Sequence, residues 1–579
     1  MPILRLALAQ TNPRLGDFSR NSSQIVNTAV EAYGHGADLV AFGEMSLTGY
    51  PIEDLANRPH FLHTTWEVLE SVAQQISAAG AGAIPVIVGF PHGPLDDHHA
   101  SSHSPSAIAY NSAAVLQDGR IIGIYNKHHL PNYSVFDEYR IFRSGTDALV
   151  VHVAGADIAL AICEDIWREG GPIAAIAAVK PSLLLVINGS PFEREKDEVR
   201  LPLVQRRAEQ VNAPAVYLNL VGGQDDLVFD GGSFVTNASG KVLARAHQFV
   251  EQTLLVDIDV KESSTHGNQV GPGVVVVEAG TGHPERATRS KIVNDIAPQL
   301  DINEQIWDAL VLGMRDYVEK NGFGSVILGL SGGIDSAVCA ALAVDAIGPD
   351  RVFGVSMPSN YSSDHSRSDA DDLAERLGIN IRTEAIADLV EPVESQLHLD
   401  GVAAENLQAR IRGIILMGLS NAEGHLVLTT GNKTEIAVGY STIYGDSVGG
   451  FAPIRDVPKT LVWELARWRN EHARMKGLTP PIPENSITKP PSAELRPGQV
   501  DQDTLPEYDV LDAILDAYIT ERVERDVIIS RGFDAATVDR VISLVDRAEW
   551  KRRQGAIGPK ISEMAFGRDR RLPVTFTRN

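Results

Sequence analysis

The apolar positions of residues 1–260 fall mostly into short runs that are typical of β-strands. Runs such as ILRLALAQ, ADLVAFGE, IPVIVGF, GADIALAIC and PSLLLVINGS are rich in branched side chains. Between them, NSSQIVNTAVEAYGHG and FLHTTWEVLESVAQQISAAG carry apolar residues at the spacing of a helix. Several strands follow one another through tight Gly turns, so we expect a mixed α/β domain with much antiparallel pairing.

The pattern changes after residue 260. Residues 261–285 are rich in Gly and Ser, and we expect them to be a linker between two domains. Helices and strands then alternate strictly along residues 302–322, 325–333, 336–348, 351–359, 368–378 and 379–386. This alternation predicts a doubly wound parallel sheet, and so a Rossmann-like domain over residues 286–579. The Pro-rich polar residues 481–508 are expected to form a long mobile loop.

Composition and charge narrow the possible functions. A chain of 579 residues is too long for one core, and no stretch approaches about 18 continuous apolar residues, so we expect no membrane span. The net charge of −24 argues against nonspecific nucleic-acid binding, and it requires that any anionic ligand be held by local donors. With only two cysteines, a reducing cytoplasm is favoured. The His-containing residues 92–106 lack helical ligand spacing and are expected to be an exposed loop, not a metal site.

Cys163 stands at the end of the apolar run in IALAICEDIW. A strand that ends in a nucleophile followed by a turn is a way in which hydrolases expose a reactive atom. The adjacent Glu164 and Asp165 should raise the pKa of the thiol, so a buried lysine is needed to offset them. Lys127 in YNKHHLPNY supplies that cation, and Glu44 in AFGEMSLTGYP follows another predicted strand.

The three residues resemble the triad of the nitrilase, or carbon-nitrogen hydrolase, superfamily. The motifs appear in the order of that family, and the resemblance covers residues 3–260. It implies an α-β-β-α sandwich in which Glu44 is the general base, Lys127 stabilises developing charge and Cys163 attacks an amide carbon. Glu138 in VFDE falls where the family often has a supporting glutamate, and the N–H group after Cys163 is a candidate oxyanion donor.

A second motif, LGLSGGIDSAV, spans residues 328–338 and follows an apolar strand. It lacks the Gly-Lys-Ser/Thr ending of a Walker loop and the spacing of a dinucleotide fingerprint. A Ser-Gly-Gly turn that opens a helix at Asp335 and Ser336 still predicts an anion site, because backbone N–H groups and the positive helix end can face a phosphate. Cys339 lies on an apolar face of the same helix and is predicted to pack in a core.

The SGGIDS string resembles the pyrophosphate loop of the N-type ATP pyrophosphatases. These enzymes cleave ATP between its α and β phosphates and transfer AMP to an oxygen of the substrate, and several then use the adenylate to accept ammonia. An amide-cleaving thiol in the same chain therefore implies that one domain releases ammonia from glutamine and the other consumes it.

Three later stretches narrow the substrate. Residues 403–421 predict a helix whose Asn406, Arg410 and Arg412 lie away from an apolar face made of Leu407, Ile411, Ile414, Ile415 and Leu419. Residues 426–446 predict a strand that runs into a polar turn. The basic run EWKRRQ near the end of an acidic chain indicates an anion site.

Together, SGGIDSA, ENLQARIRG, TTGNKTEIAVGYSTIYGD and KRRQ resemble the glutamine-dependent NAD⁺ synthetases over nearly the whole chain. The resemblance implies that glutamine is held by Tyr133, Ser190 and Lys196. It implies that ATP is held by Thr430 and by a loop made of Gly329, Leu330, Ser331, Gly332, Gly333, Ile334, Asp335 and Ser336. It further implies that deamido-NAD⁺ contacts Asn406, Glu435 and Lys551, and that Mg²⁺ is bound by Asp335 and Glu435.

The implied reaction is the amidation of deamido-NAD⁺ to NAD⁺, the last step of NAD⁺ biosynthesis, with ATP cleaved to AMP and pyrophosphate. Free ammonia would mostly protonate at neutral pH, so chemistry and family alike imply an enclosed passage between the two sites. The resemblance also implies a homo-oligomer. Two alternatives remain open at this point: another amide-forming ligase of the same class, and a nitrilase-type amidase whose nucleotide domain only senses ATP.

Overall fold

The computed structural model describes residues 3–93, 108–263, 273–359, 364–492, 494–496 and 498–575. Most of the His-containing segment (residues 94–106) and part of the expected linker (residues 264–272) lie outside the described residues. The chain forms two compact units. Unit 1 comprises Met1–Gln224 and Phe229–Asp301, and unit 2 comprises Asp225–Val228 and Ile302–Asn579.

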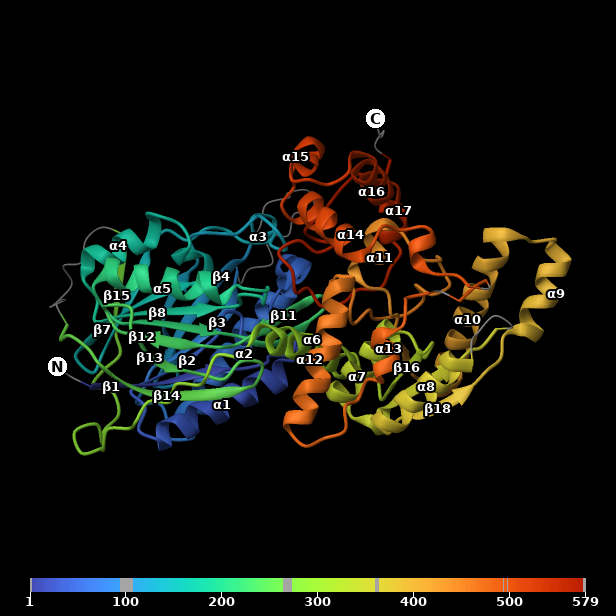
Figure 1. The fold of residues 1–579 in the computed structure, drawn as a ribbon. Coiled ribbons are helices and arrows are strands. Elements are labelled where there is room, and N and C mark those ends of the chain that lie inside the picture. The colour runs from blue at the N-terminus through green and yellow to red at the C-terminus, as the bar shows by residue number, and fades with distance from the viewer. Residues whose placement is uncertain are drawn as a thin grey trace. The chain divides into compact units, whose positions relative to one another are not determined.

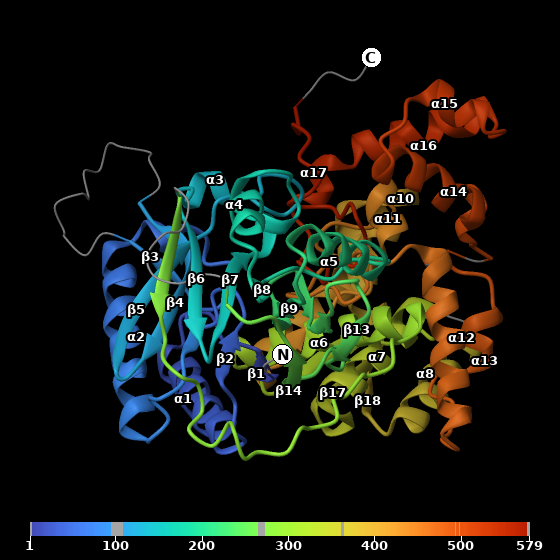
Figure 2. The ribbon, with the colours of Figure 1, turned by 90° about the vertical axis from the view of Figure 1, so that its left-hand side faces the viewer.

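Unit 1 contains two mixed β-sheets that pack face to face (Figures 1 and 2). The first has the order β14-β1-β2-β3-β4-β5, with the bounds β1 (Ile3–Gln10), β2 (Leu39–Phe42), β3 (Val86–His92), β4 (Tyr110–Gln117), β5 (Arg120–Asn126) and β14 (Gln252–Asp259). The second has the order β13-β12-β9-β8-β7-β6-β15, with the bounds β6 (Ala148–Val153), β7 (Ala156–Ile162), β8 (Leu183–Asn188), β9 (Ala215–Asn219), β12 (Phe234–Thr236), β13 (Val242–Arg245) and β15 (Val274–Glu278).

Each sheet has a parallel centre, β1-β2-β3 or β7-β8-β9, flanked by antiparallel pairs. Two antiparallel steps separate β3 from β5, so β5 runs in the same direction as β2. The chain therefore leaves β2 and β5 at the same edge of the first sheet. This topology brings Glu44, which follows β2, and Lys127, which follows β5, to one edge.

Helices cover the outer faces of both sheets. Helices α1 (Phe18–Gly34) and α2 (Pro59–Ala78) pack on the first sheet, whereas α4 (Gly171–Val179) and α5 (Asp197–Val211) pack on the second. In β1, Leu4, Leu6 and Leu8 point into the core between the sheets, while Ala7 and Ala9 face the helices. Burial on both faces explains why apolar residues occupy successive positions in these strands and do not alternate with polar ones.

Residues 274–278, inside the range expected to be a linker, form the edge strand β15 of unit 1. They pair in parallel with β6, from Val274 opposite Ala148 to Glu278 opposite His152. The structure thus differs from the expectation here, because the run VVVV extends a sheet and does not simply connect domains. Earlier in the chain, α3 (Glu138–Ile141) is a short helix, and β10 (Val221–Gln224) and β11 (Leu227–Asp230) pair in a two-stranded sheet.

Unit 2 contains a parallel sheet with the order β18-β17-β16-β19, with the bounds β16 (Val326–Gly329), β17 (Val352–Ser356), β18 (Asn380–Thr383) and β19 (Leu426–Val427). One face packs against α9 (Ala387–Leu397) and α10 (Gly401–Glu423). The strands β16 and β17 also contact α7 (Ile334–Ile347). Helix α7 in turn contacts α6 (Ile302–Lys320), α8 (Asp364–Leu377) and α12 (Lys459–Met475).

The C-terminal part of unit 2 forms a separate apolar cluster of helices. The cluster includes residues of α11 (Lys433–Val438), α14 (Tyr508–Leu515), the turn Asp516–Thr520, α15 (Arg525–Ser530) and α16 (Ala535–Arg547), and α17 (Glu549–Arg552) follows α16. The stretch expected to be a mobile loop contains α13 (Glu484–Thr488), whose Ser486 is buried and donates a hydrogen bond to the Gly332 carbonyl (2.9 Å).

The predicted fold class is confirmed: an α-β-β-α sandwich is followed by a unit built on a parallel sheet with helices. Cys339 is fully buried in α7, as its position on an apolar face predicted. Within the described part of the chain, no helix combines the length and the apolar character needed to cross a bilayer.

Candidate functional site

Glu44, Lys127 and Cys163 each stand just beyond the end of a strand of unit 1, after β2, β5 and β7. All three side chains are buried. The three side chains are close enough to interact electrostatically, because Glu44 and Lys127 both shift the pKa of Cys163. The structure therefore brings the predicted trio together.

Lys127 lies between two carboxylates. Its Nζ donates to Glu44 Oε1 (2.8 Å) and lies 2.9 Å from Glu138 Oε2. Burial alone would lower the pKa of Lys127, but Glu138 and Glu44 raise it well above its ordinary value. The lysine is thus held as an ammonium ion. Burial and the nearby Glu44 charge raise the pKa of Glu138, while Lys127 opposes this shift.

Glu44 is oriented by donors on both of its oxygens. The backbone N–H of Gly189, just after β8, donates to Glu44 Oε2 (2.6 Å). Asn111 Nδ2 donates to Glu44 Oε1 (2.6 Å), the same oxygen that accepts from Lys127. A carboxylate held by these donors has a fixed orientation, which a general base requires.

Cys163 opens a short 3₁₀ turn (Cys163–Ile166) with a positive φ of 44°. That backbone region is unusual for a residue other than glycine, and it is found at strained functional turns. Burial and Glu44 raise the pKa of the Cys163 thiol well above its ordinary value; Lys127 opposes them and Glu164 adds to them. The resting thiol is therefore protonated, and its activation requires a base.

The residues predicted to hold glutamine have definite partners. Tyr133, which is 49% exposed, donates from its hydroxyl to Glu164 Oε2 (2.8 Å). Ser190 is buried after β8, and its carbonyl accepts from Arg200 (2.9 Å). Lys196 Nζ pairs with Glu193 Oε2 (2.7 Å) and lies 5.9 Å from the centre of the Trp167 ring.

The second candidate site is a cavity of about 340 Å³ within unit 2. It lies beyond the carboxyl ends of β16, β17 and β19, since Gly329–Ser331, Val355–Pro358 and Leu428–Gly431 contribute to its lining. After β16 the chain forms β17 and β18 on one side of that strand, and then crosses to the other side of β16 to form β19. This reversal is a topological switch point, where open α/β sheets bind ligands.

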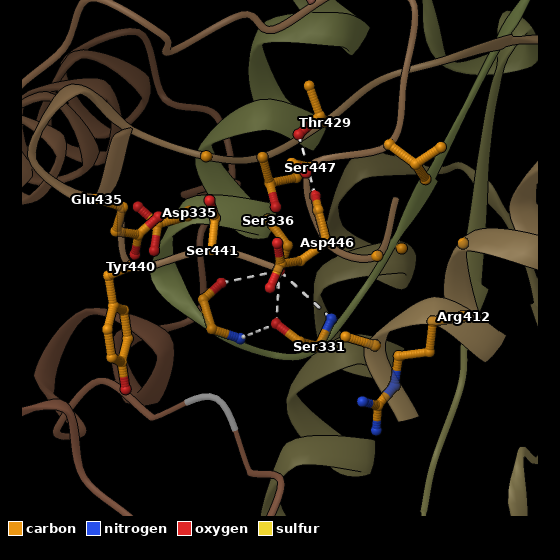
Figure 3. A pocket seen from close by; sticks show the side chains of 18 of the residues that line it. Ser331, Asp335, Ser336, Arg412, Thr429, Glu435, Tyr440, Ser441, Asp446 and Ser447 are labelled. Carbon is orange, nitrogen blue, oxygen red and sulfur yellow. Dashed lines mark hydrogen bonds between the residues drawn. The ribbon is translucent and has the colours of Figure 1, made fainter. Parts of the chain in front are cut away.

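The predicted anion turn occupies one wall of this cavity (Figure 3). Gly332 adopts a φ of +72°, which glycine tolerates, and α7 begins directly after Gly333. Ser331 Oγ accepts from Gly333 N–H (3.2 Å) and lies 3.2 Å from Ser336 Oγ. The start of α7 thus combines a glycine turn, hydroxyl groups and a helix N-terminus, a combination suited to a phosphate chain.

Two carboxylates share one end of the cavity. Asp335 and Glu435 both contact the ammonium of Lys459, and Asn432 Nδ2 donates to Asp335 Oδ1 (3.0 Å). Arg412 lines the other side in Figure 3. Burial raises the pKa of Glu435 to about 8; Lys459 opposes this shift and Asp335 adds to it, because a second negative charge beside Asp335 is unfavourable in a buried site.

These two carboxylates fit a magnesium ion that takes its other ligands from substrate. Mg²⁺ is usually held by one or two carboxylates together with phosphate oxygens and water. Among the described residues there is no group of three or more His, Cys, Asp or Glu side chains arranged for a metal. A metal bound here would therefore depend on oxygen ligands from a bound nucleotide.

Two family models match the chain. The carbon-nitrogen hydrolase model matches residues 5–265, and the NAD synthase model matches residues 306–555. The chain is 44% identical to the glutamine-dependent NAD(+) synthetase of Acinetobacter baylyi over 99% of its own length and 98% of the relative's. It is 43% identical to the enzyme of the same name from Thermotoga maritima over 99% of both chains. The chain belongs to the family of glutamine-dependent NAD(+) synthetases.

A solved member of this NAD(+) synthetase family has the same fold. The structure from Acinetobacter baumannii, in complex with adenosine diphosphate, is 41% identical and aligns with a TM-score of 0.73. It covers 99% of this chain and 98% of its own. The predicted combination of a nitrilase-like domain with an NAD synthetase domain is thus confirmed.

Most residues that the NAD(+) synthetase resemblance assigned to the nucleotide site line the cavity, including Thr430, Glu435 and Lys551. Two of them do not line it: Gly332 and Asn406. Asn406 Oδ1 accepts instead from Thr442 Oγ1 (2.7 Å), and the Gly332 carbonyl accepts from Ser486.

Sequence reasoning also missed residues of the cavity. Lys459 is buried between Asp335 and Glu435, yet it sits in PKTLVWELA, where nothing distinguishes it from a surface lysine at a helix start. Lys489 lines the cavity from the segment that was expected to be a mobile loop. A signal for Lys489 was available, since the run SITKPP places a lysine among prolines that restrict the chain.

Proposed function

We propose that this chain converts deamido-NAD⁺ to NAD⁺ with ATP and the amide nitrogen of glutamine. The observation that carries the proposal is that one chain holds both a buried Glu44–Lys127–Cys163 centre and a switch-point cavity with an anion turn and two carboxylates. Unit 1 would be the glutaminase and unit 2 the synthetase.

In unit 1, Glu44 takes the proton from Cys163 Sγ as the sulfur attacks the amide carbon of glutamine. The Lys127 ammonium and the backbone N–H of Glu164 face the charge that develops on the carbonyl oxygen. The tetrahedral adduct expels ammonia, which receives the proton from Glu44, and leaves a thioester on Cys163. Water activated by Glu44 then hydrolyses the thioester, giving glutamate and the free thiol.

The raised pKa of Cys163 supports this assignment of Glu44. Burial and neighbouring carboxylates make the free thiolate unfavourable at rest, so proton removal must accompany attack. Glu44 is held by Gly189 and Lys127 for that task. Tyr133, Ser190 and Lys196 would hold the substrate glutamine, with Lys196 offering a cation to its carboxylate.

In unit 2, the nicotinate carboxylate of deamido-NAD⁺ attacks the α-phosphorus of ATP, and pyrophosphate leaves. Ammonia then attacks the carbonyl carbon of the acyl adenylate, and AMP leaves, so that the carboxamide forms. The loop Gly329–Ser336 and Thr430 would hold ATP. Asn406, Glu435 and Lys551 would contact deamido-NAD⁺; for Asn406 this requires that its bond to Thr442 be exchanged.

Asp335 and Glu435 would hold Mg²⁺, which supplies neutralisation of the pyrophosphate leaving group when it is bound. Lys459 contacts both carboxylates and so holds the pair in place. The cytoplasm is our proposed compartment, because the proposed nucleophile is one of two free thiols and must stay reduced. That the chain assembles into a homo-oligomer stays a prediction.

Product analysis tests the proposal. The chain is incubated with deamido-NAD⁺, ATP, Mg²⁺ and glutamine, and NAD⁺, AMP, pyrophosphate and glutamate are quantified. We expect one AMP and one pyrophosphate for each NAD⁺, with no pyrophosphate release when deamido-NAD⁺ is omitted. Pyrophosphate release with a different carboxylate would favour another ligase, and glutamine hydrolysis without ATP cleavage would favour an amidase with an ATP sensor.

A further inference from the structure

Asp165 is a fully buried carboxylate, two residues after Cys163, to which the proposed chemistry gives no role. Each of its two oxygens accepts two hydrogen bonds. Those donors come from the two chain segments that carry Lys127 and Cys163.

One oxygen of Asp165 binds the segment after Lys127. Asp165 Oδ1 accepts from the backbone N–H of His128 (3.0 Å) and from that of His129 (2.9 Å). These are the two residues that directly follow Lys127 at the end of β5. Successive N–H groups on one carboxylate oxygen fix the direction of the chain as it leaves the lysine.

The other oxygen binds on both sides of the centre. Asp165 Oδ2 accepts from the backbone N–H of Ile162 (3.0 Å), the residue before Cys163, and from the hydroxyl of Tyr125 (2.7 Å), two residues before Lys127. Burial and the Asp165 charge raise the pKa of Tyr125, so its hydroxyl stays a donor. The carboxylate thus closes the turn on which Cys163 stands.

The location explains why such a link is needed. Strands β5 and β7 belong to different sheets, so no shared ladder sets Lys127 against Cys163. Cys163 also holds a positive φ, which persists only where the surroundings enforce it. We propose that Asp165 is a positioning residue that ties the Cys163 turn to the Lys127 segment and so sets the thiol–ammonium geometry needed for glutamine hydrolysis. The inference rests on the proposed function.

Asparagine cannot replace this carboxylate. Each oxygen of Asp165 faces two donors, so the NH₂ group of Asp165→Asn would confront a pair of donors on one side or the other. A suitable control is Asp157→Asn. Asp157 is equally buried at the other end of β7, where it accepts from His152 Nδ1 (2.8 Å) and Ser263 Oγ (2.8 Å), away from the centre.

The test compares both variants in the full chain. We expect Asp165→Asn to lose about 100-fold in kcat for glutamine hydrolysis relative to Asp157→Asn, with KM within about threefold, as for a misplaced reacting group. Alkylation of Cys163 by iodoacetamide, followed by mass spectrometry against pH, gives a second readout. Cys339 is fully buried in α7 of unit 2, so its labelling reports unfolding of that unit, and a urea transition of the full chain reports unfolding of unit 1.

The alkylation profile separates positioning from charge. The groups that act on Cys163 are Glu44, Lys127, Glu164 and Glu138. If Asp165→Asn displaces Lys127 from the thiol, the profile moves to higher pH by about one unit or more. Simple removal of a negative charge would move the profile to lower pH instead.

Two results would overturn the inference: a kcat for Asp165→Asn within about twofold of that for Asp157→Asn, or an alkylation profile shifted to lower pH. If Asp165→Asn does not fold, Tyr125→Phe decides, with a loss of about threefold or more in kcat expected and unchanged kcat contradicting us. Failure of the proposed glutaminase activity is recognised separately, because the parent chain would then show no glutamine hydrolysis.

Discussion

Replacing Lys127 by methionine should destabilise unit 1 in a pH-dependent way. The ammonium lies 2.8 Å from Glu44 and 2.9 Å from Glu138, and all three side chains are 3% exposed or less. Methionine keeps the apolar stem but leaves two carboxylates without their cation, both within reach of Asn111 Nδ2 (2.6 and 3.4 Å). Breaking a buried pair in this way typically costs about 3–5 kcal/mol of unfolding free energy.

The sign of the pH dependence follows from Glu138. Its pKa is already raised by burial, and Lys127 is the group that holds it down, so the pKa rises further in the variant. The folded variant then binds a proton that the unfolded chain, with an ordinary glutamate pKa of about 4.3, does not. Between about pH 4.3 and the raised pKa of Glu138, the free energy of unfolding of the variant therefore falls as the pH rises, by up to about 1.4 kcal/mol per pH unit.

Urea unfolding at about pH 7 and about pH 9 measures the gap to the parent, which should be the larger at the higher pH. Hydrogen–deuterium exchange of peptides from β2 and β5 assigns the transition to unit 1. Lys291→Met is the control: Lys291 pairs with Asp259 at the surface (2.9 Å, about half exposed), so its loss should cost less than about 1 kcal/mol. A gap for Lys127→Met that equals this control, or one that does not change with pH, would refute the reasoning.

Three further variants test other parts of the account. Asp335→Asn should eliminate synthesis from glutamine and from ammonium alike, a loss of several kcal/mol (roughly 3 or more) of transition-state stabilisation; near-normal ammonium-dependent turnover would exclude this loop as the activation site. Lys551→Met should raise KM for deamido-NAD⁺ strongly and leave glutamine hydrolysis unchanged; a KM within about twofold, or about 0.4 kcal/mol, would make Lys551 a bystander. Arg200→Met breaks a buried pair with Asp230 (2.7 Å) and should lower the unfolding free energy of unit 1 by about 3–5 kcal/mol, whereas an unchanged urea midpoint would contradict the burial argument.

The layers of the fold were predictable because they depend on local patterns. Apolar runs buried on both faces, such as β1, have no alternation, and helices between them have a single apolar stripe. Strand pairing was not predictable in the same way. Nothing local in VVVV tells that residues 274–278 add to the edge of a sheet begun at β6, because pairing depends on partners distant in sequence.

The candidate site shows the same division. Glu44, Lys127 and Cys163 were recognisable because each follows directly, or within two residues, on the apolar run of a strand. Lys459 was not, because its burial between two carboxylates arises only when α7, α11 and α12 meet. Ile414 was placed on the apolar face of a helix, and this was wrong: it is 63% exposed, since the buried stripe of α10 includes Gln408 and Ala409.

The central claim is that one chain removes nitrogen from glutamine at Cys163 and installs it on the dinucleotide. Glutamine labelled with nitrogen-15 in its amide group, supplied with deamido-NAD⁺ and ATP, tests this directly by mass spectrometry of the NAD⁺ formed. We predict that the parent chain places the label in the carboxamide, and that Cys163→Ala forms NAD⁺ only from added ammonium and never from labelled glutamine. Unlabelled NAD⁺ from the parent chain, or labelled NAD⁺ from the folded Cys163→Ala variant, would contradict the account.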